Sequence, residues 1–551
     1  MARIRELSIE NYKSVGEQIT IKFPDNAPVV LIGENNTGKS NISRALELLF
    51  GDFHPGYKDM DDHDHFDRDP RNKINIEAYL SGVRGTVSDS GRAVACSGVW
   101  LTAQKGMKNV FGGFIEENGN KSEYVKADVR SELKCVVVNS EYSLSHQLSY
   151  ASKYTLLSKL TKSFHQKLTD NEDNVQNLKV LYEGIKKVYN SVSEFEKFQA
   201  NMSTIAGSFM QCMTHALKFD FSAYDPSNYF KSLRVNPIEG ELVRTFEELG
   251  SGQQQILALA FAQAYADHFI DDGLLFVFDE PEVNLHPLAQ DWLAEKLTEL
   301  AKSGIQILIT THSPYFLNLL NIESLYIVRK NQGQTYVKNL TASELMNHCL
   351  TTGVSHKILN ESNVVNYYAY QATREILKGF FAKKIVLVEG RTEELALPVW
   401  LKKVGLNTLE EGIDFINVHG KPNLAKWWRF FTAYNIPTYV VFDIDHFSKD
   451  RLFNYNKALK DCHFPEDQVG SVLSDDDWNM SDRFLTFGYN FEVTLRNSIE
   501  LYWTRERELE DFYGTAAKHV IAKECARTIK LSDYSGALEN FTRLKEILLK
   551  L

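Results

Sequence analysis

The sequence predicts an α/β protein in two parts: a first domain interrupted by a helical insertion, and a second, parallel α/β domain. Three observations support this prediction. The apolar run Val29–Ile32 leads into a glycine-containing loop and then into a segment with helical spacing. Residues 142–216 are rich in Lys, Glu, Asn, Ser and Leu and have helical periodicity. After residue 384, strand-like and helix-like segments alternate again.

Length and composition set the outer limits. A chain of 551 residues exceeds what one hydrophobic core usually supports, so we expect about two to four domains. It has no apolar run long enough to cross a bilayer, and its first residues alternate polar and apolar side chains as a strand does. These features predict a cytoplasmic protein with no membrane partner. The six cysteines are scattered without a CxxC pair, which predicts reduced, structural thiols.

The formal net charge of -11 at pH 7 bears on possible partners. Phosphate contacts need Lys and Arg at the binding face, so DNA could be bound only at a locally basic surface. A site built from carboxylates adds negative charge that bound cations would offset. The acidity therefore weakens a DNA-binding interpretation without excluding it.

The first domain opens with the strand-like segments Ile4–Ile9 and Ile19–Phe23, a proline turn and the buried strand Val29–Ile32. The next eight residues match GxxxxGK[ST], whose glycines let backbone amides turn toward phosphate. Lys39 would neutralise the β and γ phosphates of ATP, and Ser40 would bind Mg²⁺. The alternative is a coincidental glycine turn, which the flanking strand and helix disfavour. The residues expected at the nucleotide are Gly33, Asn35, Asn36, Gly38, Lys39 and Ser40.

A second strand-end motif belongs to the same predicted site. The apolar strand Leu274–Phe278 ends in Asp279 and Glu280, which suits a water-linked Mg²⁺ ligand followed by a carboxylate that polarises the attacking water. Two solvated acids are the alternative. Because this strand follows the helical segment, the ATPase core is predicted to be split. The predicted domains are residues 1–140 and 217–340 for the ATPase, 141–216 for an insertion with a role in dimerisation, 341–380 for a helical linker and 381–551 for the second domain.

Three further motifs resemble the ABC ATPase superfamily, and in particular its DNA-repair branch with SMC and RecF-type proteins. LGSGQQQ at Leu249–Gln255 is similar to the ABC signature, FDEPEVNLHP resembles a Walker B motif with a D-loop, and THSP places His312 at the family's switch histidine. The resemblance implies that Ser251, Gly252 and Gln253 complete the ATP site of an opposite subunit. It therefore implies a homodimer or higher homo-oligomer formed through the ATPase domain.

No Q-loop glutamine is evident at the place where the family has one. The stretch DMDDHDHFDRD, residues 59–69, stands there instead. We interpret it as a solvated loop and not as a metal site, because it has neither a turn glycine nor a recognised ligand spacing.

Acidic residues follow two strands of the second predicted domain. Glu389 ends the strand-like KKIVLV and precedes Glu393 and Glu394 at a helix start, while Asp443 and Asp445 follow the strand-like YVVF on one face. Ligands bind at the carboxyl ends of parallel strands, and acids that converge there repel one another unless cations intervene. The pattern predicts bound Mg²⁺ or Mn²⁺. Helix caps and a solvated loop are the alternative.

The V-E-G turn followed by D-x-D resembles the Toprim domain, and an ABC head followed by VEGRTEELALP is similar to the OLD (overcoming lysogenisation defect) family. That family includes the GajA nuclease of Gabija defence and retron-associated effectors. The resemblance implies an ABC-type ATPase head with a helical insertion, followed by a Toprim domain. It also implies two metal sites, with Glu394 as a competitor of Glu393. Their ligands would be Glu389, Asp443 and Asp445 for one ion, and Glu393 and Glu492 for the other.

Members of the family also have a late lysine that stabilises the scissile phosphate. The best match is Lys518, with Lys523 and Lys530 nearby, although a surface position is the commoner role for a lysine. The turn formed by His419, Gly420 and Lys421 resembles the family's intermediate glycine turn and is as compatible with a plain loop.

The resemblance implies an ATP-regulated, metal-dependent DNA endonuclease or nickase in antiphage defence, acting with a helicase or with a retron reverse transcriptase and its DNA. The rival hypothesis is an SMC-like or RecF-like ATPase that clamps DNA without cutting it. The acidic residues favour the nuclease, because a docking surface has no need of converging carboxylates. A topoisomerase or primase is disfavoured, since no accompanying domain with a nucleophilic tyrosine or zinc ribbon is evident.

Overall fold

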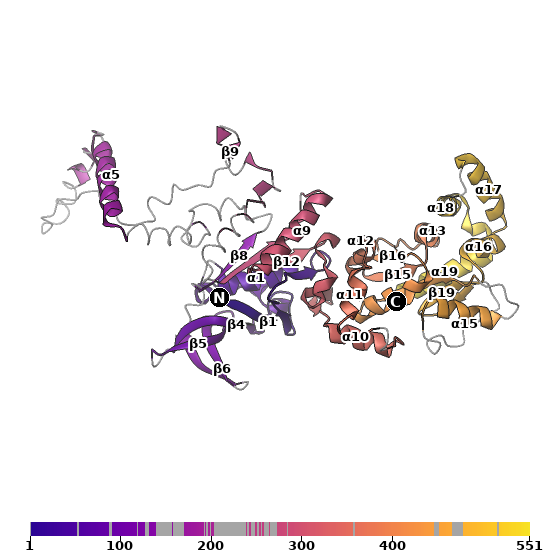
Figure 1. Cartoon of the computed structure of the whole chain (residues 1–551), viewed down its shortest axis with the longest axis horizontal. Coiled ribbons are helices and arrows are strands. Elements are labelled where there is room, and N and C mark those ends of the chain that lie inside the picture. Colours follow the sequence, from indigo (N-terminus) through magenta and orange to yellow (C-terminus); the bar gives the residue numbers. More distant parts are fainter. Residues whose placement is uncertain are drawn as a thin grey trace.

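The computed structural model describes residues 2–51, 54–87, 91–117, 120–126, 132–138, 170–191, 273–283, 285–355, 359–445, 451–464, 478–514 and 517–551, with short pieces between residues 157 and 264. In Figure 1 the first domain lies at the left, the second α/β domain at the right, and helices α10 to α12 lie between them. Most of the predicted insertion falls outside the described residues. Its described helix is α5 (Glu172–Asn190), which stands apart from the sheets in Figure 1.

The first domain is built on a largely parallel sheet. Its central strands are buried along their whole length, as expected for parallel strands covered on both faces. The edge strand β14 is antiparallel to β13. In spatial order the described strands are β14 (Gln334–Lys338), β13 (Leu325–Asn331), β3 (Val29–Ile32), β12 (Gln306–Thr311), β11 (Gly273–Asp279) and β8 (Leu133–Val138). Helix α1 (Lys39–Phe50) follows β3 and leads toward β4 (Ile74–Val87) of a second sheet, and helix α9 (Pro287–Lys302) connects β11 to β12.

An antiparallel sheet packs against this layer. It contains the two predicted N-terminal strands and a run of long strands that sequence reasoning did not place. Its described strands are β2 (Ile19–Lys22), β1 (Arg3–Glu10), β4 (Ile74–Val87), β5 (Ala93–Ala103), β6 (Val110–Glu117) and β7 (Asn120–Lys126). Alternate residues of β4 are buried, and they share one core with the apolar face of α1. This core holds the start of α1 in place.

The second domain has the expected α/β architecture with one antiparallel edge. Strands β15, β16, β17 and β19 are parallel, as predicted, and β18 runs antiparallel to β19 at one edge. The described order is β16 (Ile413–Asn417), β15 (Lys384–Val388), β17 (Thr438–Asp443), β19 (Phe484–Phe487) and β18 (Trp478–Met480). The helices are α13 (Arg391–Lys403), α14 (Leu424–Ala433), α15 (Arg451–Asp461), α16 (Phe491–Ser498), α17 (Leu501–Tyr513), α18 (Lys518–Thr528) and α19 (Ser535–Lys550).

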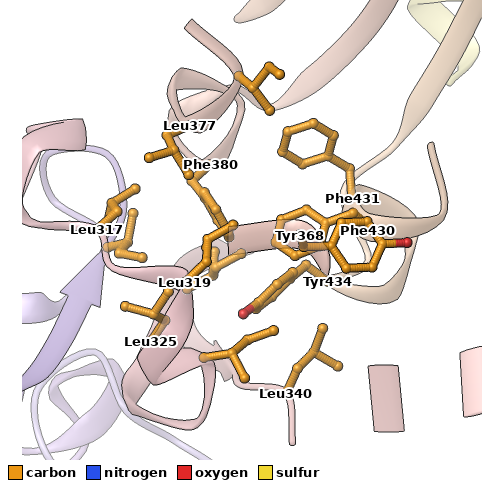
Figure 2. Close-up of a cluster of buried hydrophobic side chains, with 14 of the residues drawn as sticks. Leu317, Leu319, Leu325, Leu340, Tyr368, Leu377, Phe380, Phe430, Phe431 and Tyr434 are labelled. Atoms are coloured by element: carbon orange, nitrogen blue, oxygen red, sulfur yellow. The ribbon is translucent and has the colours of Figure 1, made fainter. Parts of the chain in front are cut away.

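The segment predicted as a polar linker is part of a shared core. Its helices are α10 (Ala342–Thr351), α11 (Val364–Ala369) and α12 (Arg374–Leu377). Figure 2 shows Leu319 of the first domain, Tyr368 and Phe380 of the linker, and Phe430 and Tyr434 of the second domain in one apolar cluster. Separating the two domains would expose these side chains, so the junction resists independent motion.

No cysteine that the structure describes forms a disulfide bond; the described cysteines are all buried, at Cys96, Cys135, Cys349, Cys462 and Cys525, and Cys212 lies outside the described residues. Among the described residues, no helix combines the length and the apolar character needed to span a bilayer.

Candidate ATPase and metal sites

The loop after β3 has two positions that admit only glycine. Gly38, just before α1, has φ 107°, and a Cβ there would come within 2.3 Å of Thr335 Oγ1. At Gly33 a Cβ would stand 2.2 Å from the main-chain oxygen of Val328 on the neighbouring strand β13. Both contacts would force the loop apart. The loop thus wraps the N-terminus of α1, which is where backbone amides can bind a phosphate.

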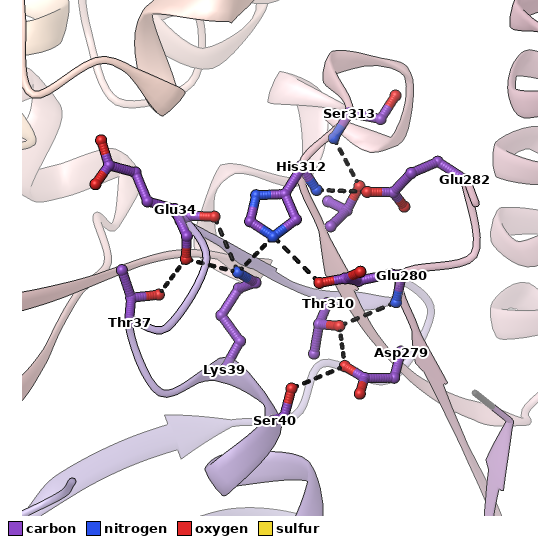
Figure 3. Close-up of polar contacts among 12 residues, drawn as sticks. Glu34, Thr37, Lys39, Ser40, Asp279, Glu280, Glu282, Thr310, His312 and Ser313 are labelled. Atoms are coloured by element: carbon purple, nitrogen blue, oxygen red, sulfur yellow. Dashed lines mark hydrogen bonds and ion pairs between the residues drawn. The ribbon is translucent and has the colours of Figure 1, made fainter. Parts of the chain in front are cut away.

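Lys39 is held inside this loop and is 4% exposed. Its Nζ donates to the main-chain oxygens of Gly33 at 2.9 Å and Glu34 at 3.0 Å, and lies 2.9 Å from His312 Nε2 (Figure 3). Burial lowers the pKa of Lys39, an effect that the nearby carboxylates of Glu280 and Asp279 oppose. The ammonium group is therefore placed beside the loop amides, as neutralising a phosphate group requires.

Strand β11 brings the two predicted acids to the same place. Asp279 Oδ1 accepts a hydrogen bond from Ser40 Oγ at 3.4 Å and another from Thr310 on β12 (Figure 3). The two residues predicted to bind Mg²⁺ with the nucleotide, Ser40 and Asp279, thus lie side by side. Glu280 has φ 53°, and its main-chain N–H donates to the main-chain oxygen of Thr310 at 3.0 Å. This turn directs the Glu280 carboxylate to His312 Nε2, 3.2 Å away.

His312 therefore lies between the ammonium group of Lys39 and the carboxylate of Glu280. Burial lowers the pKa of His312, and the charge of Lys39 lowers it further. Sequence reasoning did not select Glu282, whose Oε1 accepts the main-chain N–H of His312 at 2.6 Å. Burial raises the pKa of Glu282. In the sequence, Glu282 could have been identified as the third acid of FDEPE, shortly after Asp279.

The remaining residues predicted at the nucleotide are placed only in part. Asn35 and Asn36 are exposed on the loop, and Asn36 has φ 64°. Gln253 is exposed, and its Oε1 accepts the main-chain N–H of Gly250 at 3.3 Å. Ser251 and Gly252 lie outside the described residues.

The interpretation of residues 59–69 as a solvated loop was wrong in part. Asp64 and His65 are buried, at 6% and 1% exposed. Asp64 forms an ion pair with Lys13 at 2.7 Å, and His65 Nδ1 lies 2.8 Å from the main-chain oxygen of Asn72. The ion pair attaches the segment to the chain just after β1 and compensates for the burial of the Asp64 carboxylate.

In the second domain, Glu389, Asp443 and Asp445 converge. One carboxylate oxygen of each lies within 4.8 Å of the others. Glu389 follows β15 and Asp443 ends the adjacent parallel strand β17. Burial raises the pKa of Asp443 well above its usual value, and the negative charges of Glu393 and Glu389 add to this. Closely spaced oxygen ligands of this kind can hold a divalent cation.

Glu393 and Glu492 border the same group. Glu393, in the first turn of α13, is 5% exposed, and Glu492, in the first turn of α16, is 9% exposed. Burial raises the pKa of Glu393 to about 7, with further contributions from Glu492 and Glu389. Burial, and to a smaller extent the charge of Glu394, raises the pKa of Asp414, which lies on β16 outside this group. Of the two competing acids, Glu393 therefore faces the cluster.

Two lysines lie near this acid cluster, which we define as Glu389, Glu393, Asp443, Asp445 and Glu492. Lys421 Nζ is 2.5 Å from Asp445 and 3.8 Å from Glu389, so the turn after β16 supplies a cation that the prediction had left undecided.

Lys518 is exposed at the first residue of α18. Helix α18 packs along α13, and Lys403 at the end of α13 donates to the main-chain oxygens of Arg527 and Ile529 at the end of α18. The two helices therefore run in the same direction. Lys518 thus lies at the end of α13 that carries Glu393.

Comparison with known proteins identifies the two domains in which these candidate sites lie. The model of the AAA ATPase domain matches residues 3–236 and 228–317, and the model of the OLD-like Toprim domain matches residues 380–445. The OLD nuclease of Thermus scotoductus is 25% identical over 80% of this chain and 82% of its own length. The Old nuclease of Escherichia phage P2 is 23% identical over 83% and 80%, and the endonuclease GajA of Bacillus cereus is 23% identical over 49% and 42%. The chain therefore belongs to the OLD family, in which an AAA-type ATPase domain is joined to an OLD-like Toprim domain.

Proposed function

We propose that this chain is an ATP-regulated DNA endonuclease or nickase that uses Mg²⁺ or Mn²⁺ and acts in bacterial antiphage defence. The observation that carries the proposal is the acid cluster, in which carboxylates from separate strand and helix ends meet with Lys421 as a paired cation. The names of the three relatives, all nucleases, support cleavage as the reaction.

The residues of the cluster fit a divalent cation. Among the described residues, no donor bonds to the buried Glu389 Oε2, and burial together with the mutual repulsion of the acids raises the pKa of Asp443 and Glu393. A bound cation would satisfy that oxygen and remove the repulsion. Glu389, Asp443 and Asp445 would hold one ion, and Glu393 with Glu492 would contribute to a second. Such ions activate a water molecule and stabilise the leaving oxygen of a phosphodiester.

The lysines would act on the DNA backbone. Lys421 pairs with Asp445 at the rim of the cluster and can contact a phosphate brought there, while Lys518 is exposed at the neighbouring helix start. Glu280 would polarise the water that attacks ATP, and His312 would contact the terminal phosphate. The cluster disfavours a DNA clamp without cleavage, because clamping requires no buried carboxylates.

Control by ATP is supported by contacts between the nucleotide loop and the second domain. Lys383 Nζ lies 3.8 Å from Glu34 Oε2, and Arg329 donates to the main-chain oxygen of Ala382 at 3.0 Å. Lys383 immediately precedes β15, the strand that leads to Glu389. A change in the loop can therefore reach the acid cluster through one strand. We also infer a homodimer or higher homo-oligomer in which the signature loop of one copy faces the ATP site of another, and a helicase or retron reverse transcriptase with its DNA as partner.

A plasmid-cleavage assay with a matched pair of variants tests this function. We expect the protein to cut or nick supercoiled DNA with Mg²⁺ and to leave it intact with EDTA. The Glu393→Gln variant should require about 10-fold to 100-fold more Mg²⁺ to reach the same rate. The substitution removes one of the two carboxylates proposed to contribute to the second ion. Glu394→Gln should behave as the wild type, because Glu394, the next residue of α13, is not one of the acids of the cluster. Cleavage in EDTA, or equal metal requirements of the two variants, would contradict the assignment.

A further inference from the structure

A cavity of about 570 Å³ lies between the linker helices and the second domain, outside the acid cluster. Its volume falls in the range of sites that take small ligands, roughly 300 to 1,000 Å³. The cavity is bounded by α11, by the turn that precedes α14, by the first part of α14 and by the end of α15. The side chains on which the inference depends are Tyr367, Lys426, Arg429, Lys460, His463 and Phe464.

Two of the cations that line the cavity are buried, and no described carboxylate pairs with either of them. Lys426 and Arg429 are each 4% exposed. Arg429 donates to the main-chain oxygens of Thr352 at 3.1 Å and His463 at 2.8 Å, and Lys426 donates to the side-chain oxygen of Gln371. All of these acceptors are neutral. Within the part of the chain that the structure describes, neither cation forms an ion pair, and no carboxylate lines the cavity.

This arrangement is electrostatically costly in the absence of an anion. Burial lowers the pKa of Lys426 to about 8, which still leaves it mostly protonated at neutral pH. Burial of an unpaired charge is unfavourable, and hydrogen bonds to neutral acceptors offset only part of the cost. Lys460 adds a further, exposed cation at the rim. The described lining residues therefore carry positive charge and no negative charge, which a phosphate group would supply.

The aromatic lining narrows the chemistry of the ligand. Tyr367 and Phe464 are half-buried, and Lys426 Nζ lies 5.3 Å from the centroid of the Tyr367 ring. Cations beside aromatic faces suit a nucleotide, whose base stacks while its phosphate is neutralised.

Consecutive residues of the chain connect the cavity to the acid cluster. Pro422 and Asn423 line the cavity and directly follow Lys421, whose Nζ is 2.5 Å from Asp445. We propose that this cavity binds a nucleotide of the DNA strand held at the acid cluster, with its phosphate against Lys426, Arg429 and Lys460. This proposal rests on the proposed nuclease function. It supplies the locally basic surface that a chain of net charge -11 needs for DNA.

Binding of a fluorescent single-stranded oligonucleotide, measured by anisotropy in EDTA, separates this proposal from cleavage. We expect Lys460→Gln and Lys426→Met each to raise the Kd about 10-fold, as for the loss of one charged phosphate contact. Lys457→Gln, on an exposed part of the same helix α15 outside the cavity lining, should leave the Kd unchanged. Thermal melting of each variant reports whether it is folded, and Lys460→Gln alters an exposed side chain.

The outcomes are distinct. An unchanged Kd in folded Lys460→Gln, or equal losses in Lys460→Gln and Lys457→Gln, would overturn the cavity assignment even if the wild type cuts DNA. A Kd raised only by the cavity variants supports it even if the wild type fails to cut, in which case the nuclease proposal fails. Thymidine monophosphate is the second arm: if the cavity variants lose binding of it while DNA affinity is unchanged, the cavity takes a free nucleotide and the strand assignment is wrong.

Discussion

Asp443→Asn is expected to reduce metal-dependent DNA cleavage by about 1,000-fold or more, which corresponds to about 4 kcal/mol of transition-state stabilisation. Asp443 Oδ1 accepts the main-chain N–H of Phe491 at 3.0 Å, and asparagine keeps that acceptor. The substitution removes the negative charge that the metal requires. Because the acids of the cluster repel one another, the variant should fold at least as well as the wild type in EDTA. Plasmid cleavage and thermal melting in EDTA check these two expectations, and ATP hydrolysis, which should be unchanged, shows whether the ATPase site is intact.

The matched control is Asp482→Asn, which removes one carboxylate from an exposed turn between β18 and β19 of the same domain. It should cleave at the wild-type rate. If Asp443→Asn retains cleavage in a preparation free of contaminating nuclease, the acid cluster is not the seat of the reaction. If it loses ATP hydrolysis as well, the defect extends beyond the metal site.

Glu280→Gln should slow ATP hydrolysis by about 100-fold to 1,000-fold while ATP binding is retained. The Glu280 carboxylate is 3.2 Å from His312 Nε2, at the end of the strand that also carries Asp279. Glutamine occupies the same volume and cannot accept a proton from the attacking water. Steady-state phosphate release and equilibrium binding of a fluorescent ATP analogue measure the two effects separately.

Glu295→Gln on the exposed side of α9 is the control and should hydrolyse ATP normally. A Glu280→Gln variant that hydrolyses ATP at the wild-type rate would show that another group polarises the water. A variant that no longer binds ATP would show that Glu280 serves the shape of the site, through its left-handed main chain, and not proton transfer.

The sequence predicted the positions of residues that lie in a chemical motif directly after an apolar strand. The loop at Gly33 to Ser40 and the acids at Glu389 and Asp443 each follow an apolar strand, so their positions in the fold follow from neighbouring residues alone. The structure brings Ser40 to Asp279 and Glu389 to Asp443 across large sequence separations, as parallel strands allow. The roles of these residues stay predictions until the variants are measured.

The parts that sequence reasoning missed depend on tertiary packing. Residues 341–380 have a polar composition, yet Tyr368 and Phe380 enter a core shared with Phe430, which no local pattern reveals. The charge of Lys426 became informative only when its burial and neutral partner were known. Glu282 accepts a hydrogen bond from the main-chain N–H of His312, which follows a different strand, so this contact exists only in the folded chain. The long strand β4 does show alternation in the sequence and could have been predicted.

Anomalous diffraction from crystals of the wild-type protein grown with Mn²⁺ tests the central claim most directly. If the acid cluster binds the metal, a manganese peak is expected between the carboxylates of Glu389, Asp443 and Asp445. The peak should be absent from Asp443→Asn crystals prepared in the same way. A well-ordered second domain with no peak at these carboxylates, or with manganese bound only elsewhere in that domain, would contradict the claim.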